Sequence, residues 1–264
     1  TGFLFAYCLD GKGGGVSLDL DGVKNWTAEE GTLWVHLDYS QSDAKRWLEH
    51  ESGIDPLMQE ALLAAETRPR CLVFKDAMLL ILRGVNLNQG AEPEDMVSIR
   101  FWLEEHRIVT MRRRKVMAVE DLRQAIEAGS GPVGSGSFLE ELSDRLATRM
   151  GGVIADIDDA FDALEVEVLT EQSYELRPKL ASIRRKVISL RRYIAPQRDV
   201  IAHLQSEKVT WLGDLERMRL REIGDRTTRY VEDLDSIRDR STVTQEELNS
   251  SLTEQMNKTM YVLS

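Results

Sequence analysis

The last forty residues of the chain contain no residue that breaks a helix. Pro196 is the final proline and Gly224 is the final glycine, so residues 225–264 are free of both. At about 1.5 Å per residue, this stretch predicts roughly 60 Å of continuous helix, which is longer than a compact domain of this size requires.

Polar residues occupy part of the apolar seam of this helix. The seam positions alternate in steps of three and four residues, but several of them carry hydroxyl side chains. Because a two-stranded zipper is rarely so polar, the pattern predicts either a wider bundle around an aqueous axis or a helix that leaves the domain. The seam consists of Leu220, Ile223, Thr227, Tyr230, Leu234, Ile237, Ser241, Thr244 and Leu248.

Two further long helices precede this one, the first acidic and the second basic. Residues 154–175 hold eight acids and no base, and residues 177–198 hold eight bases and no acid. We expect the connection at Tyr174–Arg177 to fold the two helices back antiparallel, so that their charges attract and their apolar seams pack. Each exposed ion pair contributes only about 0 to 1 kcal/mol, so the seams carry most of the stability.

These charged runs are candidate ion-attracting surfaces, with ordinary solvated helix faces as the alternative. The expected cation-attracting face consists of Asp156, Asp158, Asp159, Asp162 and Glu165. The expected anion-binding face, for chloride or another anion, consists of Arg184, Arg185, Arg191 and Arg192.

The first 131 residues have a different pattern, in which strands and helices alternate. Runs rich in β-branched, leucine and aromatic residues are separated by turn signals such as Gly11–Gly15 and Asn88–Gly90. Asp55-Pro56 is typical of a helix start, and Ser137 with Glu140 forms a capping box that opens the helical half. The expected strands are Phe3–Leu9, Leu33–Tyr39, Leu72–Phe74, Met78–Leu87, Met96–Leu103 and Arg107–Arg112, and the expected helices are Ala44–Glu51, Leu57–Ala65 and Met117–Ala128.

The two patterns together predict an α+β/α fold with two domains. An N-terminal α/β domain with a central mixed, partly antiparallel sheet spans residues 1–131, and a long-helix domain spans residues 132–264. The second domain comprises an acidic helix at 132–176, a basic helix at 177–206 and a stalk helix at 209–264. Glycine and serine residues at 129–136 mark the boundary.

Composition and motifs exclude several classes of function. The formal net charge of −11 disfavours nucleic acid as a partner, and the four bases Arg112–Lys115 are more typical of a solvated strand edge or of a contact between subunits. Cys8 and Cys71 lack the spacing of a zinc site. Because the chain also lacks the common phosphate-loop and catalytic motifs, we expect no enzymatic activity and no cofactor.

Two pairs of residues are candidate metal ligands. His36 and Asp38 are two apart on a predicted strand, and His203 and Glu207 are four apart on a predicted helix, so the members of each pair would face the same side. Two ligands do not complete a tetrahedral zinc site, and ordinary surface or half-buried histidines remain the alternative.

Several short sequence motifs follow one another along the chain. They are Glu66-Thr67-Arg68-Pro69-Arg70, Arg83–Asn88, Glu94–Arg100, Leu176–Pro178, Ser182–Arg185, Ala195–Arg198, Asp225–Tyr230 and Met256–Ser264. This set resembles the cytoplasmic part of the CorA superfamily of metal-ion transporters over essentially the whole chain. Its arginine-rich members resemble the ZntB branch more than the magnesium-transporting CorA branch.

The resemblance implies a funnel-shaped homopentamer, with the α/β domain at the rim and the last helix lining the axis. It implies zinc as the transported ion, and it places Asn257, Met260 and Leu263 at the cytoplasmic mouth of the pore. It also implies membrane attachment through transmembrane helices after Ser264, with this part on the cytoplasmic side of the inner membrane. The chain begins without an initiator methionine and ends in apolar residues with no helix stop, so we expect a piece of a longer protein.

Two alternatives remain open from the sequence. The first is transport of magnesium or cobalt, as in the CorA branch. The second is a soluble coiled-coil scaffold with no role in ion transport.

Overall fold

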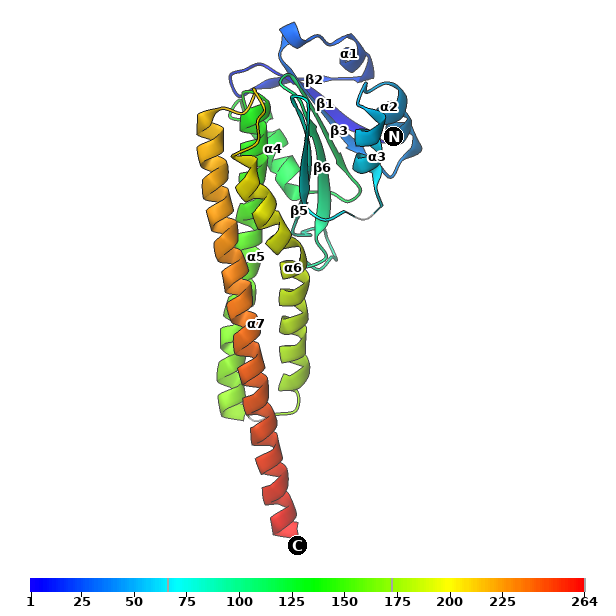
Figure 1. Cartoon of the computed structure of the whole chain (residues 1–264). Helices are drawn as coiled ribbons and strands as arrows, with labels where there is room; N and C mark the ends of the chain where they lie inside the picture. The colour runs from blue at the N-terminus through cyan, green and yellow to red at the C-terminus, as the bar shows by residue number, and fades with distance from the viewer. Residues whose placement is uncertain (66, 172, 264) are drawn as a thin grey trace.

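The computed structural model describes residues 1–65, 67–171 and 173–263 of the chain. A β-sheet with short helices lies at one end of the molecule, and three long helices extend from it (Figure 1). These are α5 (Ser135–Glu171), α6 (Leu176–Leu204) and α7 (Asp214–Leu263), and α7 continues beyond the turn that joins α5 to α6. The arrangement confirms the predicted fold class, an α/β part followed by a stalk of long helices.

Seven strands form one mixed sheet in the order β2-β1-β3-β7-β6-β5-β4. Strands β3 and β7 are parallel, and the other neighbouring pairs are antiparallel. The prediction of a central, partly antiparallel sheet is therefore confirmed. The strands are β1 (Phe3–Leu9), β2 (Gly15–Leu18), β3 (Thr32–Asp38), β4 (Arg70–Phe74), β5 (Ala77–Gly84), β6 (Val97–Leu103) and β7 (Arg107–Arg112).

Helices cover both faces of the sheet, because successive side chains of the inner strands point to opposite faces and both sets are apolar. Trp34 of β3 packs on the face covered by α4 (Met117–Glu127) and by α5, where Phe138 meets its ring edge-on at 4.9 Å between centroids. Its neighbour Val35 packs on the other face, with Leu48 of α2 (Ser42–His50) and Leu62 of α3 (Pro56–Leu63). Full burial of each such side chain contributes about 1.5–3 kcal/mol, so these contacts fix the helices on the sheet.

The sequence does not predict three short elements between β1 and β3. They are β2, α1 (Leu20–Asn25) and the 3-10 turn η1 (Ala28–Glu30). Strand β2 lies at the edge of the sheet with Val16 and Ser17 exposed, so it lacks the apolar run that marks a buried strand. Helix α1 is capped by Asp19, whose carboxylate accepts a hydrogen bond from the Gly22 amide at 2.8 Å, and it is too short to show helical periodicity.

Several predicted boundaries are wrong, among them the start of the stalk helix, which is Asp214 and not residue 209. The strand predicted to reach Leu87 ends at Gly84, because residues 85–96 form the loop between β5 and β6, although the two strands are antiparallel neighbours as expected. Helix α5 begins at Ser135, and Ser137 does not cap the amide of Glu140. The Ser137 hydroxyl instead accepts from the amides of the two residues 133 and 134 at 2.9 and 3.1 Å, in the turn before the helix.

The two glycine-rich tracts contact each other. Gly13 has a positive φ of 101°, and a Cβ atom at this position would lie 2.9 Å from the carbonyl oxygen of Gly129. The amide of Gly131 donates to the carbonyl of Gly13 at 2.7 Å. The conformation and the close approach both require glycine, so these tracts are turns, as predicted.

The polar seam of α7 is buried inside the stalk. Leu234 is fully buried in one cluster with Phe161 of α5 and Leu190 of α6. The hydroxyls of Thr227 and Thr244 donate to the carbonyl groups four residues before them, at 2.7 and 3.0 Å. The Thr244 hydroxyl also lies 3.5 Å from a carboxylate oxygen of Glu165 on α5. The prediction that this seam faces an aqueous axis is therefore wrong, because the seam is buried against the other two long helices and its hydroxyls have partners within the chain.

Helix α7 takes most of the charged contacts of the acidic and basic helices. The turn folds α5 and α6 antiparallel, as predicted (Figure 1). Among the described residues, the ion pair that joins these two helices directly is Lys179 with Glu167, at 2.9 Å. The predicted attraction between their charged faces is largely replaced by ion pairs through α7, which packs extensively on both.

The sheet and the helices share a hydrophobic cluster. It includes Leu80 of β5, Leu142 of α5, Ile201 of α6 and Leu220 of α7. The three long helices follow one another in the predicted order. The division into two domains at residue 131 stays a prediction, because residues on both sides of it contribute to this one cluster.

Candidate functional site

One face of α7 is exposed along its whole length. Its positions alternate in steps of four and three residues. They lie about 200° around the helix from the buried seam, since each residue turns an α-helix by about 100°. We call this surface the exposed stripe. It consists of Asp225, Arg229, Glu232, Ser236, Asp239, Val243, Glu246, Ser250, Thr253, Asn257 and Met260.

An acid occupies every seventh position in the first part of the exposed stripe. Asp225, Glu232, Asp239 and Glu246 follow one another at intervals of about 10.5 Å along the helix. A row of carboxylates on one helix face creates a negative potential that attracts cations. The spacing of these acids is visible in the sequence, but the sequence prediction followed the apolar positions and missed it.

Ion pairs hold α7 against the other two helices with the exposed stripe facing away from them. Arg240 contacts Asp162 of α5 at 2.6 Å and also binds Glu165. Hydrogen bonds to Glu165 and then Asp162 hold the pKa of Arg240 above its ordinary value. On the other flank, Arg191 of α6 contacts Asp235 of α7 at 2.5 Å, and this hydrogen bond lowers the pKa of Asp235.

The predicted cation-attracting face of α5 is partly neutralised. Asp158 lies 3.4 Å from the guanidinium of Arg240 on α7, which also binds Asp162 and Glu165. Burial, and next the charge of Asp162, raise the pKa of Asp158. Asp156 and Asp159 are exposed, so ion attraction by this face stays a prediction that now rests on these two acids.

The predicted anion-binding face of α6 divides in the same way. Arg191 is paired with Asp235 of α7, and Arg184 donates to Gln245 of α7 at 2.5 Å. Arg185 and Arg192 are exposed. Binding of chloride or another anion by these two arginines stays a prediction.

His36 does not form a metal site with Asp38. Its side chain is 1% exposed, and Nδ1 lies 2.7 Å from the hydroxyl of Thr110, which accepts from Trp34 Nε1 at 2.8 Å. The Thr110 hydroxyl also lies 3.5 Å from the carbonyl oxygen of Val35, and the buried imidazole is neutral. Burial, together with a nearby arginine, lowers the pKa of His36 to about 3. Asp38 accepts instead from the Ser40 hydroxyl at 2.6 Å.

His203 and Glu207 do not lie on one helix. Helix α6 ends at Leu204, so Glu207 belongs to the following loop, and His203 Nδ1 lies 2.6 Å from the carbonyl oxygen of Asp199. In the part of the chain that the structure describes, no three histidine, cysteine, aspartate or glutamate residues are grouped so as to hold a metal ion.

The exposed stripe reaches the C-terminal end of α7. Asn257 and Met260 are exposed members of it, which is compatible with the role at a pore mouth that the resemblance implies for them, and that role stays a prediction. The side chain of Leu263 lies outside the described residues. None of the helices in residues 1–65, 67–171 and 173–263 combines the length and the hydropathy needed to cross a bilayer.

Comparison with known proteins establishes the family. A family model with the description "CorA-like Mg2+ transporter protein" matches residues 29–264. The chain belongs to this family. Among CorA-like relatives, the zinc transport protein ZntB of Yersinia enterocolitica is 37% identical over 261 residues, which cover 99% of this chain and 79% of that protein. The divalent cation transporter CmaX of Pseudomonas aeruginosa is 39% identical over 268 residues, covering 99% of this chain and 80% of that protein.

Solved structures agree with this assignment. The structure of full-length CmaX matches with a TM-score of 0.93 at 37% identity, over 99% of this chain and 81% of that chain. The ZntB cytoplasmic domain of Vibrio parahaemolyticus shares the fold with a TM-score of 0.83 at 23% identity, over 96% of this chain and 99% of that chain. The resemblance to the ZntB branch of the CorA superfamily is therefore confirmed.

Proposed function

We propose that this protein is the cytoplasmic, ion-gathering part of a zinc transporter of the ZntB kind. In this proposal, five copies surround an axis that is lined by the exposed stripes of α7. The zinc transport proteins among the relatives, at 35–37% identity, support zinc as the transported ion. The likeness to CmaX and to the ZntB cytoplasmic domain supports a position on the cytoplasmic side of the inner membrane. Zinc is cargo in this proposal, and the protein needs no resident cofactor.

The exposed stripe is the observation that carries the proposal. Helices α5 and α6 cover one side of α7 as far as Leu252 and leave the other side open, and the side chains of residues 253–262 are exposed around the whole helix. Its steps of four and three residues average 3.5, the spacing that keeps one helix face toward a common axis when neighbouring helices supercoil. In a five-fold assembly, each acid of the stripe would form a ring of five carboxylates.

The four rings of carboxylates would outweigh the one ring of guanidinium groups formed by Arg229, so they would raise the local concentration of divalent cations and repel anions. Toward the C-terminal end, the stripe changes from acids to the neutral side chains of Ser250, Thr253 and Asn257. Conduction requires that an ion be attracted strongly enough to enter and held weakly enough to leave. The change from carboxylates to neutral oxygen ligands along the stripe meets both requirements.

Two measurements test the proposal. Native mass spectrometry of the chain should give pentamers, and a monomer at high concentration would contradict the assembly. The complete gene product, reconstituted in vesicles, should take up Zn²⁺ in preference to Mg²⁺ and Co²⁺.

A second candidate function is transport of magnesium, cobalt or divalent cations in general. The description of the matching family and the name of CmaX, at 39% identity, favour it. Uptake of Mg²⁺ or Co²⁺ in preference to Zn²⁺ in the same vesicles would replace the zinc proposal by this one. Absence of uptake for all three ions would favour the scaffold alternative.

A further inference from the structure

The outer faces of α5 and α6 each carry a row of residues that recurs at every seventh position. Seven residues are close to two turns of an α-helix, so the members of one row lie on one helix face. All members are exposed except Arg145, which is half-buried. The α5 row consists of Arg145, Gly152, Asp159 and Val166, and the α6 row consists of Pro178, Arg185, Arg192 and Asp199.

The two rows lie on the two sides of the stalk. Asp158 of α5 binds Arg240 of α7, and Asp159 is turned about 100° around α5 from that contact. In α6, Arg191 binds the other flank of α7, and Arg192 is turned away from it by the same angle. The rows therefore point outward on either side of the exposed stripe.

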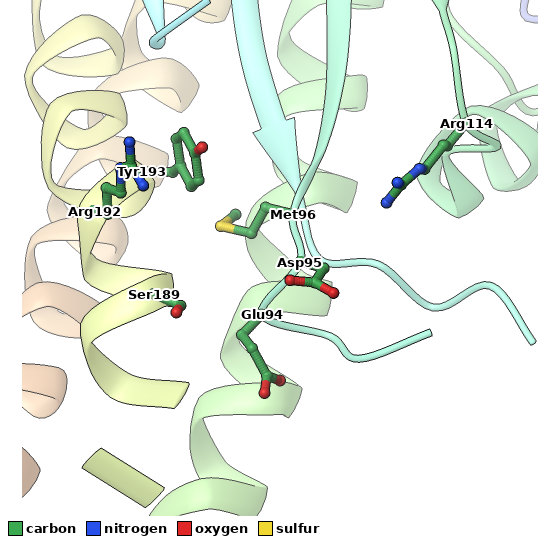
Figure 2. A pocket seen from close by; sticks show the side chains of 7 residues that line it. All are labelled: Glu94, Asp95, Met96, Arg114, Ser189, Arg192 and Tyr193. Atoms are coloured by element: carbon green, nitrogen blue, oxygen red, sulfur yellow. The ribbon is translucent and has the colours of Figure 1, made fainter. Parts of the chain in front are cut away.

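The central charges of the rows have no ion-pair partner within the described residues. Asp159 and Arg185 form neither a hydrogen bond nor an ion pair there. Figure 2 shows Arg192 on α6, with Glu94 and Asp95 on the loop that lines the other side of a cavity of about 350 Å³. None of the ion pairs in the described part of the chain joins Arg192 to either acid. These charges are available to a partner outside the chain.

Contacts between α5 and α6 show which residues lie at the same height along the stalk. Lys179 contacts Glu167 at 2.9 Å, and Gln197 Nε2 lies 4.0 Å from Met150 Sδ. The two helices are antiparallel, so interpolation between these contacts gives each residue of α6 a residue of α5 at its own height, at about 1.5 Å per residue.

The two rows are complementary at matched heights. Each charge of the α6 row corresponds to an opposite charge of α5 within about 2 to 4 Å in height, and its proline corresponds to a valine. The pairs are Arg185 with Asp159, Arg192 with Asp156 (exposed beside the α5 row), Asp199 with Arg145, and Pro178 with Val166. Arg145 and Asp199 also have partners within the chain, at 3.2 and 2.9 Å. The first two pairs therefore carry the complementarity.

A rotation about an axis parallel to the stalk keeps every residue at its height. In a ring of parallel copies, the α5 side of one copy meets the α6 side of the next. We propose that the α5 row of each copy binds the α6 row of the next copy, so that opposite charges meet at every contact of the ring. This contact rests on the proposed five-fold assembly. Exposed ion pairs add little affinity, so the rows act chiefly by selecting and orienting the neighbouring copy.

Cross-linking of cysteine variants of the complete gene product in vesicles tests the contact. In Asp159→Cys with Arg185→Cys, each copy offers one cysteine to each neighbour, so a short bismaleimide should give a ladder of covalent dimers up to pentamers. Either substitution alone should give only the background of the wild type, in which Cys8 and Cys71 are half-buried. The matched control is Asp159→Cys with Asp199→Cys. It uses the same two faces at heights about 17 Å apart, and it should give no ladder.

Charge reversal tests the pairing itself. Asp156→Arg with Asp159→Arg brings like charges together at every contact and should weaken the association of the chain about tenfold in native mass spectrometry at low ionic strength. Adding Arg185→Asp and Arg192→Asp to the same chain makes the charges opposite again and should restore the pentamers.

The outcomes separate this contact from the assembly on which it rests. Pentamers without a covalent ladder would overturn the contact and leave the five-fold assembly standing, whereas a monomeric wild type would overturn both. Cross-linking through Asp159→Cys alone would show that α5 meets α5, which would overturn the contact. A fourfold variant that assembles no better than the twofold reversal would also overturn it.

Discussion

At the scale of single residues, His36 shows how burial changes the chemistry of a candidate metal ligand. Histidine and aspartate two apart on a strand share one face, which is why the sequence suggests a metal site. In this sheet, that face is covered by α4 and α5, and His36 packs against Trp34 and Phe5. Nδ1 of His36 contacts the hydroxyl of Thr110. The sequence does not show which face of a strand is covered by helices, and here that covering decides the role of His36.

Burial of neutral His36 makes the stability of the protein depend on pH. The pKa of His36 is about 3 in the folded chain, against about 6.5 in the unfolded chain. Between these values the unfolded state binds the proton and the folded state does not, so the free energy of unfolding falls as the pH falls. From pH 7 to pH 5, His36 should account for a loss of about 2 kcal/mol.

Urea unfolding of the wild type and of His36→Gln over this pH range measures the contribution. The variant should lose less stability than the wild type as the pH falls, whatever its stability at pH 7. Parallel losses in the two proteins would contradict a neutral, buried His36.

Arg240 is the counter-charge for three acids of α5, and its removal should destabilise the stalk. Arg240→Met keeps an apolar contact with the ring of Phe161, which lies 4.8 Å from the guanidinium, but it leaves Asp158, Asp162 and Glu165 to repel one another. The arginine is about one-third exposed, so we expect a loss of about 1–2 kcal/mol in the free energy of unfolding, between the values for surface and buried pairs.

The matched control for Arg240→Met is Lys258→Met. Lys258 pairs with Glu254 at 2.7 Å on an exposed part of α7, and its removal should leave stability unchanged. The loss in Arg240→Met should also shrink as the pH falls to about 4 and the acids of α5 take up protons. A loss that is independent of pH would show that packing and not charge is responsible.

At the scale of elements, α7 has one buried face and one exposed face, and the sequence alone does not show which is which. The Thr227 hydroxyl of the buried seam bonds to its own helix, so removing it should cost nothing. Thr227→Val keeps the side-chain shape, and it should leave the free energy of unfolding unchanged or raise it by up to about 1 kcal/mol. A clear loss of stability in denaturant unfolding would mean that this hydroxyl has a partner outside its own helix.

The elements with strong periodicity are the ones that the sequence predicts. The long helices α5, α6 and α7 and the buried strands follow from apolar spacing, because each must bury one face or both. Strand β2 and helix α1 do not, because they are short and largely exposed. The two faces of α7 carry similar spacing, and choosing between them requires knowing where α5 and α6 lie, which depends on contacts such as Arg191 with Asp235 that are distant in sequence.

At the scale of the whole molecule, charge is sorted into regions. The acids of the exposed stripe lie on the stalk, and four arginines gather at the edge of the sheet, namely Arg83, Arg100, Arg113 and Arg114. The formal net charge of −11 is therefore a poor guide to local chemistry. A cation can approach along the stripe although arginines gather at the sheet edge, because salt at physiological concentration screens exposed charges beyond about 8 Å.

The effect of the exposed stripe on Zn²⁺ uptake should depend on where its acids lie and not on the total charge of the chain. Neutralising its four acids, with Asp225→Asn, Glu232→Gln, Asp239→Asn and Glu246→Gln, should lower Zn²⁺ uptake by the complete gene product in vesicles by about tenfold at low ionic strength. The reduction should shrink at high ionic strength, where the screening length falls to about 3 Å.

The matched control neutralises four exposed acids on the short helices around the sheet and therefore changes the net charge equally. These substitutions are Asp21→Asn, Glu29→Gln, Glu49→Gln and Glu60→Gln. If the stripe lines the path, the control should transport at nearly the wild-type rate at both ionic strengths, because its acids would lie outside the stalk axis. Equal reductions in the two proteins would instead assign the effect to the overall field of the molecule and would remove the stripe from the proposed path.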